Sequence, residues 1–195
     1  IPDLPGFGAS TGPESGWTTE DYAQWLEEFC LQIVRTYKEN VFACIGHSFG
    51  GKIAAVFSGH KRILAFEKLI LIDASGIPIP LTFSQRILRG LSLMTPGPIK
   101  KAISPHLKAQ TYKALAGDSD YAAATTAQKN TLQKILTEDI TASLQQISIP
   151  TLLIWGTNDK VPPLWVGERF AQAIPHSELK TYSTGHFPHH EKPQQ

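Results

Sequence analysis

The stretch Gly46-His47-Ser48-Phe49-Gly50-Gly51 decides how the rest of this 195-residue sequence is interpreted. It has the pattern Gly-x-Ser-x-Gly, follows the short apolar run 41–45, and precedes a segment rich in small residues. A serine framed by glycines between a strand and a helix is typical of a sharp turn that projects the hydroxyl from the end of a sheet. Ser48 is therefore a candidate nucleophile, and a glycine-rich structural turn is the alternative interpretation.

The proposed turn makes demands on the residues around the serine. We expect Ser48 to adopt a strained backbone, and side chains two residues on either side of it to collide, so that Gly46 and Gly50 are required. A helix that begins at Ser48 directs its free N–H groups and the positive end of its dipole toward the site. The backbone N–H of Phe49 is therefore the candidate oxyanion-hole donor.

A nucleophilic serine needs a base, and the base needs an acid that orients it. His186 follows the last strand-like segment, and Asp159 follows the apolar run 151–155. Because the carboxyl ends of parallel strands lie along one edge of a sheet, we expect Ser48, Asp159 and His186 to meet there. Asp73, at the end of another apolar run, is the alternative acid, although we expect it to cap the turn that follows it.

Strand-like and helix-like segments alternate along much of the sequence. Apolar runs typical of buried parallel strands occur at 41–45, 68–73 and 151–155, and 178–183 is a weaker fourth strand. Helical periodicity predicts helices over 19–38, 48–58 and 164–173. Thr18 is the predicted N-cap of the helix at 19–38, and the apolar stripe of that helix, from Tyr22 to Tyr37, is expected to face the core. The alternation predicts an α/β fold with a mostly parallel sheet flanked by helices.

Residues 77–146 interrupt this alternation. They are rich in proline at their start and hold helical stretches at 84–94, 99–115 and 119–135 without a strand-like run. We therefore predict a helical cap insertion at 77–146 in a core made of residues 1–76 and 147–195. Apolar side chains of the insertion are the candidate lining of a pocket: Ile79, Leu81, Phe83, Ile87, Leu91 and Met94.

Composition argues against several other classes of protein. Lys and Arg number 18 against 17 Asp and Glu, without a long run of one sign, so a nucleic-acid-binding surface is not expected. The most apolar stretch, 69–81, contains Asp73 and two prolines, which argues against a membrane span. Cys30 and Cys44 lack the spacing of metal ligands and are expected to be buried thiols. We expect the partner to be a small-molecule substrate.

Neither a cofactor nor a metal ion is predicted. A Gly-x-Gly-x-x-Gly pattern does not follow any of the predicted strands, so a dinucleotide site is not expected. His189 and His190 lie close to His186, but without the spacing of zinc ligands they are interpreted as part of a solvated loop. His47, beside the nucleophile, is expected to pack or to shape the pocket rather than to act as the base.

Four motifs together resemble the α/β-hydrolase superfamily. They are a D-x-P-G-x-G-x-S loop at 3–10, the serine turn at 46–51, an acid loop at 153–162 and a histidine loop at 185–193. The resemblance implies the α/β-hydrolase fold with Ser48, Asp159 and His186 as its catalytic triad. It also implies strands upstream of Ile1 that carry the second oxyanion donor and a final helix after Gln195, so we expect a truncated form of the fold.

The resemblance and the residues together predict acyl transfer to water. We expect a serine hydrolase that cleaves a small lipophilic ester through an acyl-enzyme on Ser48. Carbon–carbon bond hydrolases, lactonases and cofactor-free haloperoxidases use the same triad and stay open as alternatives, as does a non-catalytic binding protein or inactive fragment. Dehalogenases and epoxide hydrolases usually have Asp in place of this serine, which argues against them.

Overall fold

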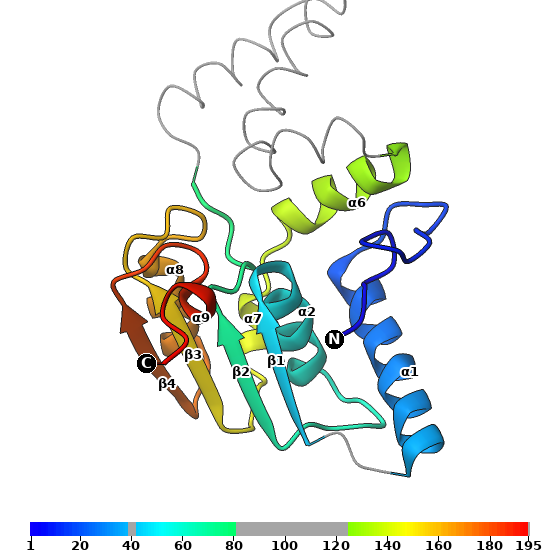
Figure 1. Cartoon of the computed structure of the whole chain (residues 1–195), viewed down its shortest axis with the longest axis horizontal. Helices are drawn as coiled ribbons and strands as arrows, with labels where there is room; N and C mark the ends of the chain where they lie inside the picture. The colour runs from blue at the N-terminus through cyan, green and yellow to red at the C-terminus, as the bar shows by residue number, and fades with distance from the viewer. Residues whose placement is uncertain (39–41, 81–124, 195) are drawn as a thin grey trace, which may run out of the picture.

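Four parallel strands form the centre of the structure, a computed structural model that describes residues 1–38, 42–80 and 125–194 (Figure 1). The strands lie in chain order across the sheet as β1 (Ala43–His47), β2 (Lys68–Ile72), β3 (Thr151–Gly156) and β4 (Ser177–Tyr182). The predicted α/β fold with a parallel sheet is confirmed. All four carboxyl ends therefore lie on one edge, as a parallel sheet requires.

The first strand begins and ends two residues later than predicted. β1 pairs with β2 in parallel from Ala43 opposite Lys68 to His47 opposite Ile72. The pairing carries the strand through the glycine at 46, so His47 is its last residue and Ser48 is the first residue of the next helix. The other three strands match their predicted ranges to within one residue.

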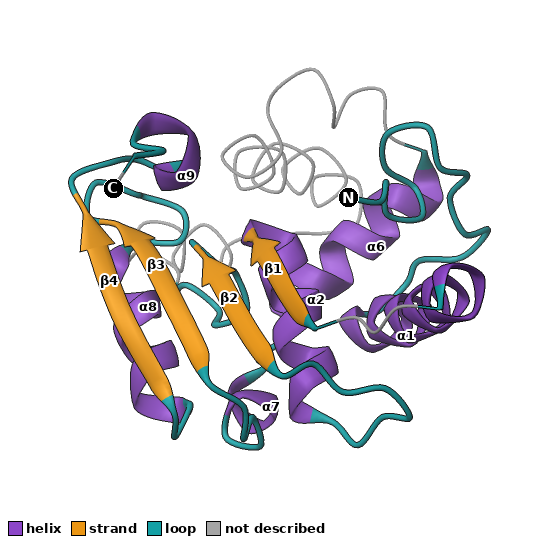
Figure 2. Cartoon of the chain, turned by 60° about the horizontal axis from the view of Figure 1, so that its bottom comes forward, coloured by secondary structure: helices purple, strands orange, loops and turns teal. Residues whose placement is uncertain are grey.

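Helices pack against the face of the sheet that lies at the back in Figure 2. The helices of the described residues are α1 (Thr19–Tyr37), α2 (Ser48–Gly59), α6 (Thr126–Thr137), α7 (Thr141–Leu144), α8 (Leu164–Ala173) and α9 (Pro188–Glu191). α2, α7 and α8 lie behind the strands, α1 lies beside α2, and α9 lies at the carboxyl edge (Figure 2). Among these helices, none is long and apolar enough to cross a membrane.

The two faces of the sheet differ in burial. Leu71 and Leu153 are fully buried on the face that the helices cover, and on the same face Trp155 packs against Phe170 of α8 with ring centroids 5.7 Å apart. On the other face Ile45 is 65% exposed, although its register partner in β2 is apolar. Complete burial of the strands on both faces, expected from their apolar sequences, is therefore not met at Ile45.

The start of α1 follows the sequence closely. Thr18 caps the helix, and its side chain and that of Asp21 exchange hydrogen bonds with each other's backbone N–H groups. The rings of Trp17 and Tyr22 are in contact, with centroids 5.0 Å apart, and Tyr22 is buried. The predicted core stripe does not extend to the end of the helix, because Tyr37 is exposed.

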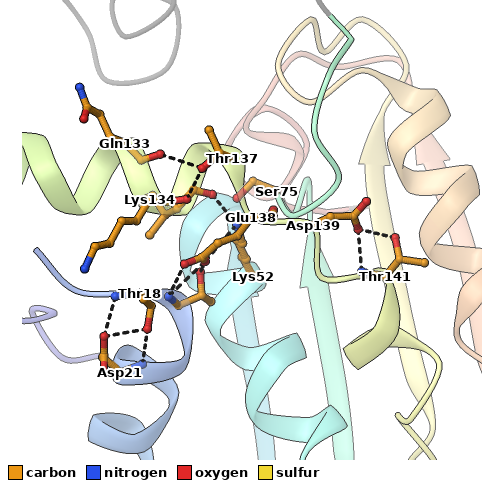
Figure 3. Close-up of polar contacts among 12 residues, drawn as sticks. Thr18, Asp21, Lys52, Ser75, Gln133, Lys134, Thr137, Glu138, Asp139 and Thr141 are labelled. Carbon is orange, nitrogen blue, oxygen red and sulfur yellow. Dashed lines mark hydrogen bonds and ion pairs between the residues drawn. The ribbon is translucent and has the colours of Figure 1, made fainter.

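A buried lysine joins α2 to the end of α6 (Figure 3). Lys52 is 1% exposed, and its ammonium group donates to the carbonyl oxygens of Ile135 and Glu138, the latter at 3.1 Å. The carboxylate of Glu138 lies 3.6 Å from Lys52 Nζ and also accepts hydrogen bonds from the backbone N–H and the hydroxyl of Thr19. Burial lowers the pKa of Lys52 to about 8, and the Glu138 charge opposes that shift.

After the predicted insertion, the chain returns to the point at which it left the sheet. The N–H of Ile140 donates to the carbonyl of Gly76 at 2.9 Å, and Ile140 and Leu144 join the main buried cluster. Of the helices predicted in 77–146, the last is represented by α6, and those at 84–94 and 99–115 lie outside the described residues. The division of the chain into core and cap stays a prediction.

Candidate active site

The backbone at Ser48 has the strained geometry expected of an exposed turn. Ser48 has φ +53°, a left-handed conformation that residues with a side chain rarely adopt. Its carbonyl oxygen accepts hydrogen bonds from the backbone N–H of Ser75 at 3.1 Å and from the Ser75 hydroxyl at 3.4 Å. The residues that follow β2 therefore hold the turn in place, which is how such strain persists in a folded protein.

Of the two glycines predicted to be crowded around Ser48, the structure confirms Gly46 and not Gly50. A Cβ atom on Gly46 would lie 2.6 Å from the carbonyl oxygen of Gly50, so this position cannot carry a side chain without a shift. A Cβ atom on Gly50 would meet nothing within 4 Å, so the prediction of a collision there is wrong. Gly51 is a second crowded position, where a Cβ atom would lie 2.6 Å from that of Ala74, because α2 packs closely against the residues that follow β2.

His186 and Asp159 are in direct contact at the carboxyl edge of the sheet. His186 Nδ1 lies 2.6 Å from Asp159 Oδ2, and the other carboxylate oxygen accepts a hydrogen bond from the N–H of Val161 at 2.8 Å. The Asp159 side chain is buried, whereas that of His186 is partly exposed. The loops after β3 and β4 thus bring together an acid and a base that are 27 positions apart in the chain.

The histidine loop reaches across the sheet edge to the serine turn. His47 Nε2 lies 2.7 Å from the carbonyl oxygen of His186, and the two rings have centroids 4.7 Å apart. Within the described residues, no hydrogen bond joins the Ser48 hydroxyl to the His186 ring. In unliganded enzymes, hydrogen bonds between catalytic groups are often long and shorten when substrate binds.

Two side chains hold the histidine loop: Glu191, whose role was not predicted from the sequence, and His47, which was expected to pack or to shape the pocket. The carboxylate of Glu191 in α9 accepts hydrogen bonds from the N–H of Gly185 at 3.0 and 3.1 Å. His47 contacts the rings of Phe187 and His189 as well as that of His186. Burial lowers the pKa of His47, so its ring stays neutral at pH 7. The order Gly-His followed by Glu five residues later was the available signal for Glu191.

The sequence suggested that Asp73 caps the turn after β2, but its carboxylate bonds elsewhere. Its Oδ1 accepts a hydrogen bond from the N–H of Gly156 at the end of β3, at 2.9 Å. Its Oδ2 is buried and has no hydrogen-bond partner among the described residues. Burial is the main cause that raises the pKa of Asp73 to about 7, the Gly156 N–H opposes it, and the charge of Asp159 adds to it. The carboxyl group thus bridges two strand ends beside the Asp159–His186 pair.

Three side chains at this edge could together ligate a metal ion. One ligand atom each of His47, Asp73 and His186 lies within 4.8 Å of the others. Both histidine rings already make a hydrogen bond, His47 to a carbonyl oxygen and His186 to Asp159. Such bonds are compatible with metal ligation through the other ring nitrogen. With the Asp159–His186 contact, the same groups also form a hydrogen-bonded acid–base cluster. His189 and His190, both exposed, lie on the short helix α9 instead of the predicted loop.

Aromatic side chains flank the serine turn on both sides. The Phe49 ring contacts those of Tyr22 and Phe7, with centroids 5.2 and 5.9 Å away. Phe7, which is 43% exposed, lies in a loop held by a 3.0 Å hydrogen bond from the N–H of Ala9 to Asp3. On the histidine side, Phe187 is 50% exposed. Of the pocket-lining residues predicted in 79–94, Ile79 is exposed and the others lie outside the described residues.

The sequence of this chain is similar to those of known proteins. A sequence model described as the alpha/beta hydrolase family matches residues 1–195. An uncharacterised protein of Mycobacterium tuberculosis is 26% identical over 220 residues, which cover 98% of this chain and 63% of that protein. An AB hydrolase superfamily protein of Bacillus subtilis is 24% identical over 206 residues, covering 94% of this chain and 72% of its own length.

The structure is also similar to that of an esterase from Exiguobacterium antarcticum. The TM-score is 0.68 at 19% sequence identity, over 98% of this chain and 75% of the esterase. A similarity of this kind is one of fold. The chain spans less than two thirds of the length of the mycobacterial relative.

Proposed function

This chain belongs to the alpha/beta hydrolase family, and we propose that it is a serine hydrolase that cleaves a small lipophilic ester through an acyl-enzyme on Ser48. One observation carries the proposal: His186 Nδ1 lies 2.6 Å from Asp159 Oδ2, in a loop that touches the residue before Ser48. A carboxylate on Nδ1 leaves Nε2 as the ring nitrogen that can accept a proton, which is what a general base for a serine requires.

The first half of the reaction forms the acyl-enzyme. His186 Nε2 takes the proton of the Ser48 hydroxyl as Oγ attacks the ester carbonyl carbon, and the carbonyl oxygen becomes an oxyanion. Asp159 stabilises the imidazolium that forms. His186 then gives its proton to the leaving alcohol oxygen as the bond between that oxygen and the carbonyl carbon breaks.

The second half regenerates the serine. A water molecule attacks the acyl carbonyl carbon while His186 Nε2 removes its proton, and the acid leaves when Ser48 Oγ takes that proton back. In both halves the negative charge develops near the start of α2, because Ser48 and Phe49 are the first two residues of that helix. Their N–H groups lack partners inside the helix and lie at the positive end of its dipole, so Phe49 N–H is the proposed oxyanion donor.

Asp159 is the proposed acid of the triad in preference to Asp73. Asp159 contacts the ring nitrogen of His186, whereas Asp73 is bonded to a backbone N–H of β3 and has its pKa raised to about 7. A carboxyl group that is partly protonated at neutral pH stabilises an imidazolium less well than an ionised one. Asp73 therefore supports the edge of the sheet in this proposal.

The aromatic side chains favour an apolar substrate. Phe7 contacts the ring of Phe49, the residue after the nucleophile, and Phe187 contacts the ring of His47, the residue before it. Both phenylalanine rings are about half exposed, so apolar groups are available on each side of Ser48. Burial of an apolar acyl or alkyl group against such rings is favourable by about 25 cal/mol for each Å² removed from water.

The proposal is tested by labelling and turnover together. In the natural protein that carries this sequence, a fluorophosphonate probe should attach to Ser48, and p-nitrophenyl acetate should be hydrolysed. Ser48→Ala should abolish both, since loss of a triad nucleophile costs on the order of a millionfold in rate. Ser15→Ala, at an exposed serine outside the site, is the matched control and should change neither. Turnover by Ser48→Ala equal to that of the control would contradict the proposal, and an unlabelled, inactive protein would favour a binding function.

A further inference from the structure

We propose that His47 is a positioning residue that sets the distance between the serine turn and the catalytic histidine by donating a hydrogen bond from Nε2 to the backbone carbonyl of His186. The inference rests on the proposed function, because it concerns the geometry of the same base and nucleophile. It assigns a specific task to a side chain from which the sequence indicated no more than packing.

The geometry of this contact is that of a strong hydrogen bond. The distance between His47 Nε2 and His186 O is 2.7 Å, at the short end of the range for N–H···O bonds. A carbonyl oxygen can only accept, so Nε2 carries the hydrogen and Nδ1 carries the lone pair. The ring is held in this orientation by aromatic contacts with Phe187 and His189, whose centroids lie 5.0 and 4.9 Å away.

The position of His47 explains why this bond matters to the reaction. His47 is the last residue of β1 and is joined through one peptide bond to Ser48, so its backbone cannot move without moving the nucleophile. Its side chain is joined to the backbone of His186 itself. The hydrogen bond therefore connects the two reacting residues by a short path, although β2 and β3 separate their strands in the sheet.

A second contact fixes the other side of the histidine. Glu191 accepts hydrogen bonds from the N–H of Gly185, one residue before His186, while His47 donates to the carbonyl of His186. Asp159 holds the ring at Nδ1. With the backbone held at two points and the ring at a third, Nε2 of His186 is left as the atom free to meet Ser48.

A neutral donor suits this place better than a charged one. The groups that face His47 are His186 and His189 on the histidine loop, Asp159 after β3 and Asp73 after β2. Burial lowers the pKa of His47, and the two histidines lower it further, while the His186 carbonyl and Asp159 oppose this. The ring thus donates its hydrogen bond without placing a second positive charge beside the imidazolium that forms on His186.

The test separates the hydrogen bond from the packing of the ring. His47→Phe keeps an aromatic ring and loses the donor, whereas His47→Gln keeps a donor nitrogen at the same number of bonds from Cβ. His190→Phe, the same substitution at an exposed histidine, is the matched control. The readouts are kcat and KM for p-nitrophenyl acetate, the rate of fluorophosphonate labelling and the thermal unfolding midpoint, all in the natural protein that carries this sequence.

We expect His47→Phe to lower kcat and the labelling rate about tenfold to a hundredfold with little change in KM, because a misplacement of about 1 Å can cost about a hundredfold. His47→Gln should restore most of the loss, and His190→Phe should match the wild type. An undiminished kcat in His47→Phe, or an equal loss in His47→Phe and His47→Gln at the same unfolding midpoint, would overturn the proposal.

A measurement on the unmodified protein covers the case in which the variants do not fold. Nitrogen-15 NMR of the wild-type imidazoles distinguishes a ring protonated at Nε2 from one protonated at Nδ1. We expect His47 to be protonated at Nε2, and a bare Nε2 would overturn the proposal without any substitution. Failure of the wild type to label at Ser48 would contradict the proposed function instead, so the two failures are distinguishable.

Discussion

Replacing Glu138 with glutamine is expected to lower the free energy of unfolding by about 1 to 2 kcal/mol at pH 7, because Lys52, with a pKa of about 8, can lose its proton there at a cost of about 1.4 kcal/mol. The reason is the burial of Lys52, which is 1% exposed and has the Glu138 carboxylate 3.6 Å from its ammonium group. Glutamine keeps the shape of the side chain and removes its charge. The ammonium group would then lose the carboxylate that faces it and would keep the two carbonyl acceptors alone, so its pKa would fall further.

Lys52→Met removes the cation instead of its anionic partner. Methionine fills a similar volume and removes the charge itself, so its cost comes from the carbonyl oxygens of Ile135 and Glu138 that lose a donor, about 1 to 3 kcal/mol. The Glu138 carboxylate keeps its hydrogen bonds from Thr19.

The pH dependence gives a second test of the same reasoning. The pKa of Lys52 is about 8 in the folded protein and 10.5 without the fold. Between these pH values the unfolded state binds more protons than the folded state, so the free energy of unfolding contributed by this group rises with pH. The added stability is lost again as pH falls through 8. The difference between the two pKa values is worth about 3 kcal/mol. Lys52→Met should lack this rise.

Urea denaturation followed by circular dichroism, at several pH values from 7 to 10.5, measures both effects. Glu28→Gln, at an exposed glutamate of α1, is the matched control and should stay close to the wild type. The reasoning would be refuted if Glu138→Gln were as stable as this control at pH 7. It would also be refuted if the stability difference between the wild type and Lys52→Met did not change across the range.

Three further outcomes are expected. Asp159→Asn should lower ester turnover about ten-thousandfold and Asp73→Asn far less, as measured by kcat; comparable losses at Asp73 with an active Asp159→Asn would make Asp73 the acid. Asp73 has its pKa raised from 3.8 to about 7, so its contribution to stability is complete below 3.8 and is lost as pH rises through 7, by about 4 kcal/mol in all. Thermal unfolding of Asp73→Asn, whose side chain cannot ionise, should lack that loss of stability. A pH profile parallel to that of the wild type would exclude Asp73 as the cause of the loss. Gly46→Ala should destabilise the protein by about 1 to 3 kcal/mol, while Gly50→Ala, in open space, should be tolerated; equal midpoints would count against the crowding at Gly46.

The arrangement of the sheet edge could be predicted because it depends on local patterns. Apolar runs predicted three of the four strands, a weaker pattern predicted β4, and the order of the residues that follow them predicted that His186 and Asp159 would meet. The limits of β1 were predicted less well, because they are set by pairing with β2 as far as Ile72. Pairing partners lie far away in the sequence, and a single apolar run does not reveal its own register.

The contacts of His47 and Lys52 could not be predicted for a related reason. His47 donates to a backbone carbonyl 139 positions away, and a carbonyl oxygen has no signature in the sequence. Lys52 occupies a helix of small apolar residues, where a lysine is normally placed on the solvent side. Its partners lie 83 and 86 positions later in the chain. Polar side chains whose partners are backbone groups of distant segments are the part of a site that sequence patterns do not reveal.

The closure of the chain between Gly76 and Ile140 has a consequence for how this protein can change over evolution. The hydrogen bond between these two residues brings the ends of a 63-residue excursion together within 2.9 Å, and Lys52 secures the returning side through Glu138. Lengthening a closed loop costs little, about 0.6 kcal/mol for each doubling of its length. The length of chain between these two residues can therefore change at small cost to folding while the sheet edge that holds Ser48 and His186 keeps its geometry.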